Sequence, residues 1–196
     1  MAVATTQPAE AAPERFLGLE QIEPIPLAWG PNQVARFTED GREGIVIRAW
    51  RDNGNAWGYQ ILMFLVQGHP GSEPWQVASI EPGGDPQPLR DLATVRPHAD
   101  GALEAARLLR GRLDGRISVF LAVARRTLTP GASPAEASQA QVILYRLEQG
   151  GEPGLTADVF RPVRTFRTRN AYCDAEMLID TVLGIPNQGD LCEWGR

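Results

Sequence analysis

Histidine and cysteine are the residues of this 196-residue chain best suited to chemistry, and there are two of each. His98 precedes Asp100 by two positions, a spacing that could supply a general acid and base. Cys173 stands at the start of a predicted helix, where a thiolate nucleophile would be stabilised. Neither has a zinc-ligating companion at a recognisable spacing, and no Gly-x-Ser-x-Gly motif occurs. An enzyme of unrecognised type using His98/Asp100 or Cys173 is therefore an alternative hypothesis, and the sequence predicts no metal and no cofactor.

The two cysteines also favour a disulfide. Cys173 and Cys192 enclose a stretch with Gly184, Pro186 and Gly189, so the chain can turn back after a helix and bring the thiols together. We expect their Cα atoms to lie within roughly 7 Å, and the bond would stabilise the fold by roughly 3 kcal/mol. The alternative is a pair of reduced thiols, as in a reducing compartment.

The charged residues exclude several classes of function. All 19 basic residues are arginine, so a Schiff-base lysine and a phosphate-loop lysine are both absent. The net charge of -5 would repel a polyanion, which argues against nucleic-acid binding. The longest apolar run, residues 61–66, is too short to span a membrane.

Aromatic residues gather around a predicted hairpin. Trp50, Trp57 and Tyr59 flank the turn at residues 52–55, whose Asn-Gly pair is a strong hairpin signal. Rings beside a hairpin can form a binding platform for a protein or a sugar, or they can cap the end of the core. We expect at least one ring to be exposed. Strand alternation places Trp57 and Tyr59 on the same face as Ile61, and that face is predicted to be core.

Arginines crowd the last predicted strand. With a period of two, Arg161, Arg167 and Arg169 share one face beside Thr165. That face could bind an anion or an acidic partner. The competing interpretation is a solvated face whose guanidinium groups pair with nearby carboxylates.

Residues 40–112 and 114–184 show an internal similarity. Asp-Gly-Arg at residues 40–42 and again at 114–116 precedes an apolar stretch, and residues 57–68 resemble residues 139–150. Each half then has a third strand and a helical pattern, carried by Leu103, Ala106, Leu109 and Leu113 in the first and by Ala175, Leu178, Val182 and Leu183 in the second. The second pattern follows the capping residue Asp174, and Gly111 and Gly184 stand where the two helices would end in a left-handed C-cap. We therefore predict an α+β fold of two duplicated β-β-β-α halves, with a mostly antiparallel sheet and two packed helices.

Composition predicts a disordered tail at residues 1–15 followed by a single domain at residues 16–196. Residues 1–15 lack the cationic start and apolar middle of a secretory signal. We expect a cytoplasmic protein, with a periplasmic or secreted protein after signal removal as the alternative. The oligomeric state is not indicated.

These observations favour a non-enzymatic interaction or accessory module that binds a protein partner. The predicted binding residues are the hairpin aromatics and the arginines of the last strand. A small-ligand or carbohydrate-binding domain is a further alternative, and it would require an apolar cavity lined by tryptophan.

Overall fold

The computed structural model describes residues 17–54, 58–71, 74–83, 88–96, 102–150 and 157–185. These residues form strands and one short helix. The elements are β1 (Glu20–Pro24), β2 (Gly30–Val34), β3 (Gly44–Arg51), β4 (Tyr59–Gln67), β5 (Trp75–Val77), β6 (Ser79–Ile80), β7 (Leu92–Val95), β8 (Glu104–Leu113), β9 (Arg116–Arg126), β10 (Ala140–Gln149), β11 (Asp158–Arg167) and α1 (Ala175–Leu183).

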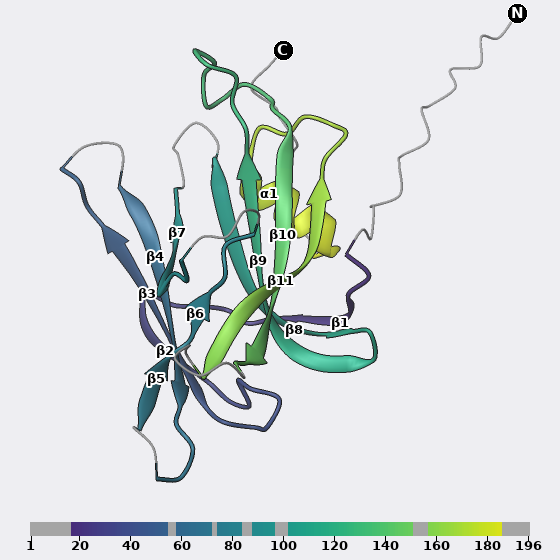
Figure 1. Ribbon diagram of the computed structural model, residues 1–196. Coiled ribbons are helices and arrows are strands. Elements are labelled where there is room, and N and C mark those ends of the chain that lie inside the picture. The colour runs from purple at the N-terminus through teal and green to yellow at the C-terminus, as the bar shows by residue number, and fades with distance from the viewer. Residues whose placement is uncertain are drawn as a thin grey trace, which may run out of the picture.

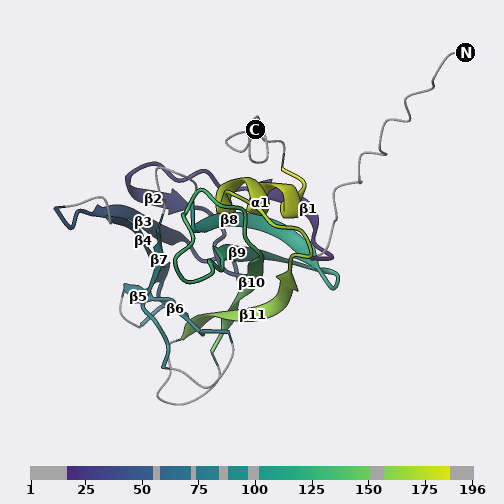
Figure 2. The same ribbon diagram turned by 90° about the horizontal axis from the view of Figure 1, so that it is seen from above.

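The strands form two sheets. The six-stranded sheet has the order β1-β8-β9-β10-β11-β6, and the five-stranded sheet has the order β2-β3-β4-β5, with β7 also pairing with β4. The pairing of β6 with β11 is parallel, and the other pairs are antiparallel. Figures 1 and 2 show the five-stranded sheet on one side of the six-stranded sheet and α1 on the other. The described residues therefore form three layers.

The six-stranded sheet is buried on both faces. Phe120 and Leu144 turn toward α1, in one core cluster, while Leu121 and Tyr145 turn toward the five-stranded sheet, in the other. This explains why β9 contains seven consecutive buried residues, from position 118 to 124. A strand with two covered faces needs apolar side chains at every position.

Helix α1 begins and ends where the sequence predicts. The Asp174 side chain caps its N-terminus by accepting from the backbone N–H groups of Glu176 and Met177, at 2.6 and 3.2 Å. Gly184 ends the helix with a φ of 67°, a left-handed conformation that favours glycine. The Asp174 carboxylate also accepts from the backbone N–H of Ala102 at 3.0 Å, so the helix start is joined to the segment before β8.

The predicted helix of the first half is wrong. Leu103, Ala106, Leu109 and Leu113 lie in or beside β8, which pairs with β9 over ten positions and with β1 on its other edge. The spacings of three and four residues fit a helix, and alanine, leucine and arginine favour one, but strand pairing on both edges of the segment overrode this local preference. Gly111, expected as a helix cap, lies inside β8, where a Cβ would come within 3.1 Å of the Leu19 side chain.

The α+β prediction is therefore overturned, because strands make up 54% of the described residues and helix 6%. Residues 114–184 do run β9, β10, β11 and α1, as expected. The described part of residues 40–112 contains six strands, β3 to β8, and no helix. The expected pair of β-β-β-α halves is thus not present.

Residues 1–15 lie outside the described residues, and in the described part no helix is long and apolar enough to cross a membrane.

Candidate functional site

A groove of about 280 Å³ opens between the two sheets beside β3 and β4. Its apolar wall comes from both sheets, and one edge is formed by residues 24–27, which begin at the last residue of β1. Polar side chains stand at its edges. Those on the five-stranded sheet are Arg48 and Gln60, and those on the opposite side are Arg107 and Glu176. A cleft with an apolar interior and a few charged groups at the edge is the usual form of a recognition site.

Two exposed tryptophans adjoin residues that line this groove: Trp29 adjoins Arg48, and Trp50 adjoins its strand partner Gln60. Trp29 and Trp50 keep 58% and 49% of their surface accessible. The Arg48 guanidinium stacks on the Trp29 ring, 4.2 Å from its centre. Arg48 also donates to the Leu27 carbonyl at 2.7 Å and to Gln60 Oε1 at 3.1 Å. These contacts hold Arg48 in one orientation, so its charge and the Trp29 ring form a preorganised surface.

Trp50 is held against the backbone of the hairpin. A Cβ built at Gly58 would lie 2.3 Å from Trp50 Cζ2, so the ring covers a position where only glycine leaves room. The expected exposure of one hairpin ring is confirmed by Trp50. Trp57 lies outside the described residues, and its part in binding stays a prediction.

Tyr59 lies on the opposite face of the hairpin from Trp50. Trp50 pairs with Gln60, and Arg51 pairs with Tyr59, so neighbouring positions point to opposite sides. Arg51 donates to the Tyr59 hydroxyl at 2.7 Å. The core face of β4 carries Leu62, Phe64 and Val66, so the expectation that the Tyr59 face is core is wrong. Both faces of β4 are apolar, and alternation alone could not show which one would be covered.

The face that carries Tyr59 is turned away from the six-stranded sheet. We call it the outer face. Its apolar residues are only partly buried, and they come from three neighbouring strands: Ile45, Ile47 and Ala49 in β3, Ile61, Met63 and Leu65 in β4, and Trp75 and Val77 in β5. In Figure 1 no described element lies beyond this sheet on that side.

A bulge divides the arginines of β11. Leu144 pairs with Arg164 and Tyr145 with Pro162, so one residue of β11 is extra, and the alternation changes phase there. Arg161 consequently lies on the opposite face from Arg167. Arg161 is 3.0 Å from Glu81 and 3.9 Å from Glu148.

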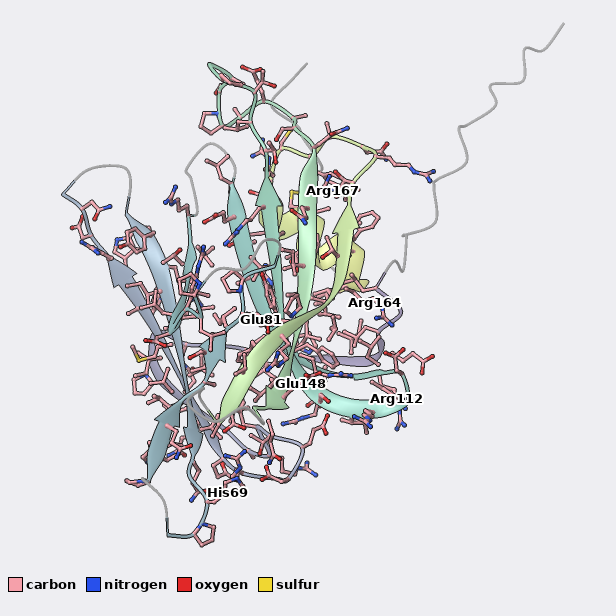
Figure 3. All side chains as sticks on the ribbon, in the orientation of Figure 1. His69, Glu81, Arg112, Glu148, Arg164 and Arg167 are labelled. Atoms are coloured by element: carbon pink, nitrogen blue, oxygen red, sulfur yellow. The ribbon has the colours of Figure 1, made fainter. Side chains whose placement is uncertain are left out.

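Figure 3 shows Glu81 and Glu148 at the lower part of the sheet, with Arg167 toward its upper end. Arg167 and Arg169 are exposed. The three predicted arginines therefore do not form one surface, and their role in binding stays a prediction.

The residues proposed for catalysis are not brought into a described site. His98 and Asp100 lie outside the described residues. Cys173 precedes α1, and its carbonyl accepts from the buried Arg126. Cys173 is disulfide-bonded, and its predicted partner Cys192 lies outside the described residues. Among the described residues, no group of three histidines, cysteines or carboxylates is placed to hold a metal.

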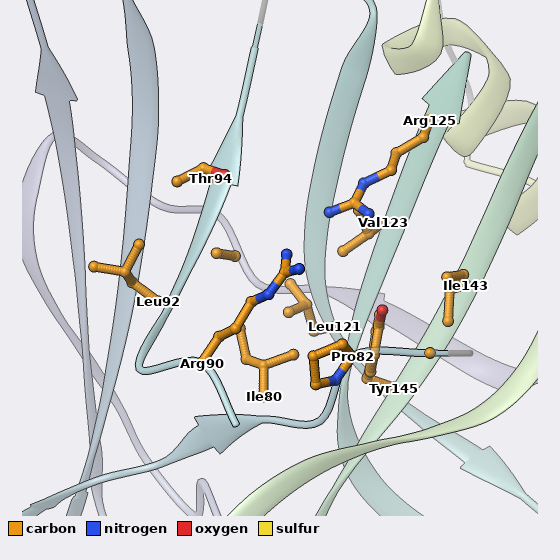
Figure 4. A pocket seen from close by; sticks show the side chains of 12 residues that line it. Ile80, Pro82, Arg90, Leu92, Thr94, Leu121, Val123, Arg125, Ile143 and Tyr145 are labelled. Atoms are coloured by element: carbon orange, nitrogen blue, oxygen red, sulfur yellow. The ribbon is translucent and has the colours of Figure 1, made fainter. Parts of the chain in front are cut away.

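A second cavity, of about 110 Å³, lies between the sheets beside β6, β7, β9 and β10 (Figure 4). Arg90 and Arg125 reach toward it, and Tyr145 stands in its wall (Figure 4). Burial raises the pKa of Tyr145, although Arg125 and Arg90 and a hydrogen bond with the Gly83 backbone act in the opposite direction. The phenol therefore stays neutral, while Arg125 pairs with Glu104 at 3.3 Å. At this size the cavity is smaller than ordinary ligand pockets, and it gives little support to a small-ligand function.

A cluster of charged side chains lies where β3 of one sheet approaches β11 of the other. Arg42, just before β3, binds the carboxylate of Asp158 in β11 with two hydrogen bonds of 2.7 and 2.9 Å. Arg42 Nε is also 2.9 Å from Asp40, whose carboxylate accepts from Thr38. Burial disfavours the charged form of Asp40, but these hydrogen bonds and the charge of Arg42 outweigh it and hold the pKa of Asp40 below its ordinary value.

The lowered pKa predicts a loss of stability in acid. Asp40 binds a proton less readily in the folded protein than in the unfolded chain, so its contribution is complete above the unfolded pKa of about 4. That contribution disappears as the pH falls through the lower folded value. We expect urea unfolding from pH 6 to pH 3 to show a steeper loss of stability for the native protein than for Asp40→Asn. Parallel curves would contradict this assignment.

The described residues thus form a two-sheet β-sandwich. Helix α1 covers the outer side of the six-stranded sheet, and a candidate recognition cleft lies between the two sheets. In fold the chain is similar to the crystal structure of CarG, with a TM-score of 0.63 and 18% sequence identity. The similarity covers 81% of this chain and 94% of that chain. No protein-family model and no curated protein matches the sequence. At this identity the likeness shows a common fold alone.

Sequence reasoning missed the groove residues Arg48 and Arg107 and the ring of Trp29, on which Arg48 stacks. These three residues stand in separate segments, and none belongs to a motif. The sequence does place Trp29 near Pro26 and Pro31 in an extended segment, and this was the local signal available for it.

Proposed function

We propose that this protein is a non-enzymatic interaction module that binds an extended segment of a partner protein in the groove beside Trp29 and Trp50. The observation that carries the proposal is the position of two half-exposed tryptophans and a fixed arginine at the edge of an apolar groove. Tryptophan, tyrosine and arginine are the residues that most often dominate the energy of protein interfaces.

The groove also indicates the chemistry of the partner segment. The apolar wall, which includes Leu62, Val95 and Leu108, suits an aliphatic or aromatic side chain as an anchor. Arg107 is occupied by a bidentate pair with Asp180, at 3.0 and 3.2 Å. Arg48, in contrast, is held by neutral oxygens, so its charge is not neutralised by them. The favoured segment therefore combines an apolar anchor with a nearby carboxylate.

Substitution of the tryptophans tests this proposal. The tagged protein is purified from its own cells, partners are identified by mass spectrometry, and their affinities are measured by calorimetry with purified protein. We expect Trp29→Ala and Trp50→Ala each to weaken binding by about 2 kcal/mol, or roughly 30-fold, as at an interface hot spot.

Ile117→Ala is the matched control. Ile117 is 52% exposed at the start of β9, a strand that contributes no residue to the groove. It should leave the affinity unchanged. All three variants should unfold within about 1 kcal/mol of the native protein, since about half of each residue is exposed. A partner that binds the two tryptophan variants with native affinity would show that the groove is not the site.

A further inference from the structure

We infer that the outer face of the five-stranded sheet is the interface of a homodimer, in which two copies pack face to face with their β3 strands antiparallel. This inference is independent of the groove, which lies on the other side of the sheet. It rests on the apolar surface of β3, β4 and β5 and on the order of charges along β3.

The outer face is more apolar than the solvated face of an ordinary antiparallel sheet. Such a face normally carries polar residues at alternate positions. Here the alternate positions of β3 are Ile45, Ile47 and Ala49, and β4 places Ile61, Met63 and Leu65 directly across from them. A contiguous apolar patch of this kind marks an interaction surface.

The charges at the two ends of β3 identify the partner as a second copy. Glu43 immediately precedes β3, and its carbonyl accepts from the Gln67 backbone N–H at 2.9 Å, so the ladder extends to this residue. By alternation Glu43 lies on the outer face, as does Arg51 at the other end, and both are exposed. The row therefore reads acid, three apolar residues and base, with Ile47 at its midpoint.

This order of charges also determines the symmetry. A twofold axis perpendicular to the strands and passing near Ile47 and Met63 brings each Glu43 opposite Arg51 of the other copy. An axis parallel to the strands would instead place like charges together. An interface with twofold symmetry uses the same patch on both copies, so both charge pairs form at once.

The size of the face is consistent with a reversible dimer. The two long strands β3 and β4, of eight and nine residues, and the shorter strands beside them are spaced about 4.8 Å apart and offer roughly 500 Å² on each copy. The total of about 1,000 Å² is near the lower bound for a specific interface, so we expect a dissociation constant in the micromolar range.

Charge exchange tests both the dimer and its symmetry. Sedimentation velocity of the full chain, between about 1 and 100 µM, should show a concentration-dependent dimer. Glu43→Arg and Arg51→Glu each place like charges at both ends of the interface, and each should weaken dimerisation about tenfold. The combined variant should restore most of the native affinity. Met63→Asp, at the centre of the face, should abolish the dimer, whereas Ile117→Asp should leave it intact.

A native chain that stays monomeric at 100 µM would overturn the homodimer. A dimer that is insensitive to Met63→Asp would place the interface elsewhere. If the single exchanges weaken the dimer and the combined variant does not recover, the antiparallel arrangement is wrong. Circular dichroism of each variant shows whether the fold is retained. Binding of the partner segment in the groove should be unchanged by all of these variants, so this test and that of the proposed function can fail separately.

Discussion

Replacing Arg42 with methionine is expected to lower the free energy of unfolding by about 3–5 kcal/mol, as urea denaturation would measure. The guanidinium and the Asp158 carboxylate are both largely buried, with exposed side-chain fractions of 9% and 2%. Removing the cation leaves a carboxylate inside the protein without its bidentate partner. Because Arg42 precedes β3 and Asp158 begins β11, the loss falls where the two sheets are joined.

Two further variants identify the cause of that loss. Arg164 and Asp114 form an ion pair of 3.1 Å, but their side chains are 45% and 62% exposed. Arg164→Ala should therefore change stability by about 1 kcal/mol or less. The double variant Arg42→Met with Asp158→Leu should recover much of the loss, because it removes the buried carboxylate as well. A single variant that unfolds like the native protein would show that the buried pair contributes little.

Replacing Phe160 with alanine is expected to cost about 3–5 kcal/mol, for a different reason. Phe160 is fully buried, and its ring centre lies 4.8 Å from that of Phe64 and 6.2 Å from that of Phe37. Phe37 is packed in turn against Gly44, where an added Cβ would be 2.3 Å from the ring. Neighbours held this closely cannot easily fill a cavity, so the loss should be near the upper end of the range.

The conservative change Phe160→Leu keeps most of the buried volume and should cost about 1–1.5 kcal/mol in the same urea experiment. If the alanine and leucine variants have equal stability, the space left by the ring is filled by relaxation. The packing of Phe37 against Gly44 would then be looser than the structure indicates.

The sequence by itself determined the elements whose signals are local. The apolar stretches of β3, β4, β9 and β10 lie between turn residues, and their positions were predicted to within a few residues. The helix α1 was predicted with both caps, because Asp174 and Gly184 act through hydrogen bonds and backbone conformation within one turn of the chain. The exposure of Trp50 followed from its place beside a tight hairpin.

Only the tertiary structure decided which strands pair and which faces are covered. Segment 104–113 is a strand because β1 and β9 pair with its two edges, and its helical spacing could not show this. The outward turn of Tyr59 depends on the position of the six-stranded sheet, because both faces of β4 are apolar.

The same reason applies to the groove and to the buried ion pair. Arg42 and Asp158 are 116 positions apart, and the groove draws on residues from β3, β4, β8 and α1. The free energy that brings such residues together comes from burial of the two cores, which depends on the whole chain rather than on any local pattern.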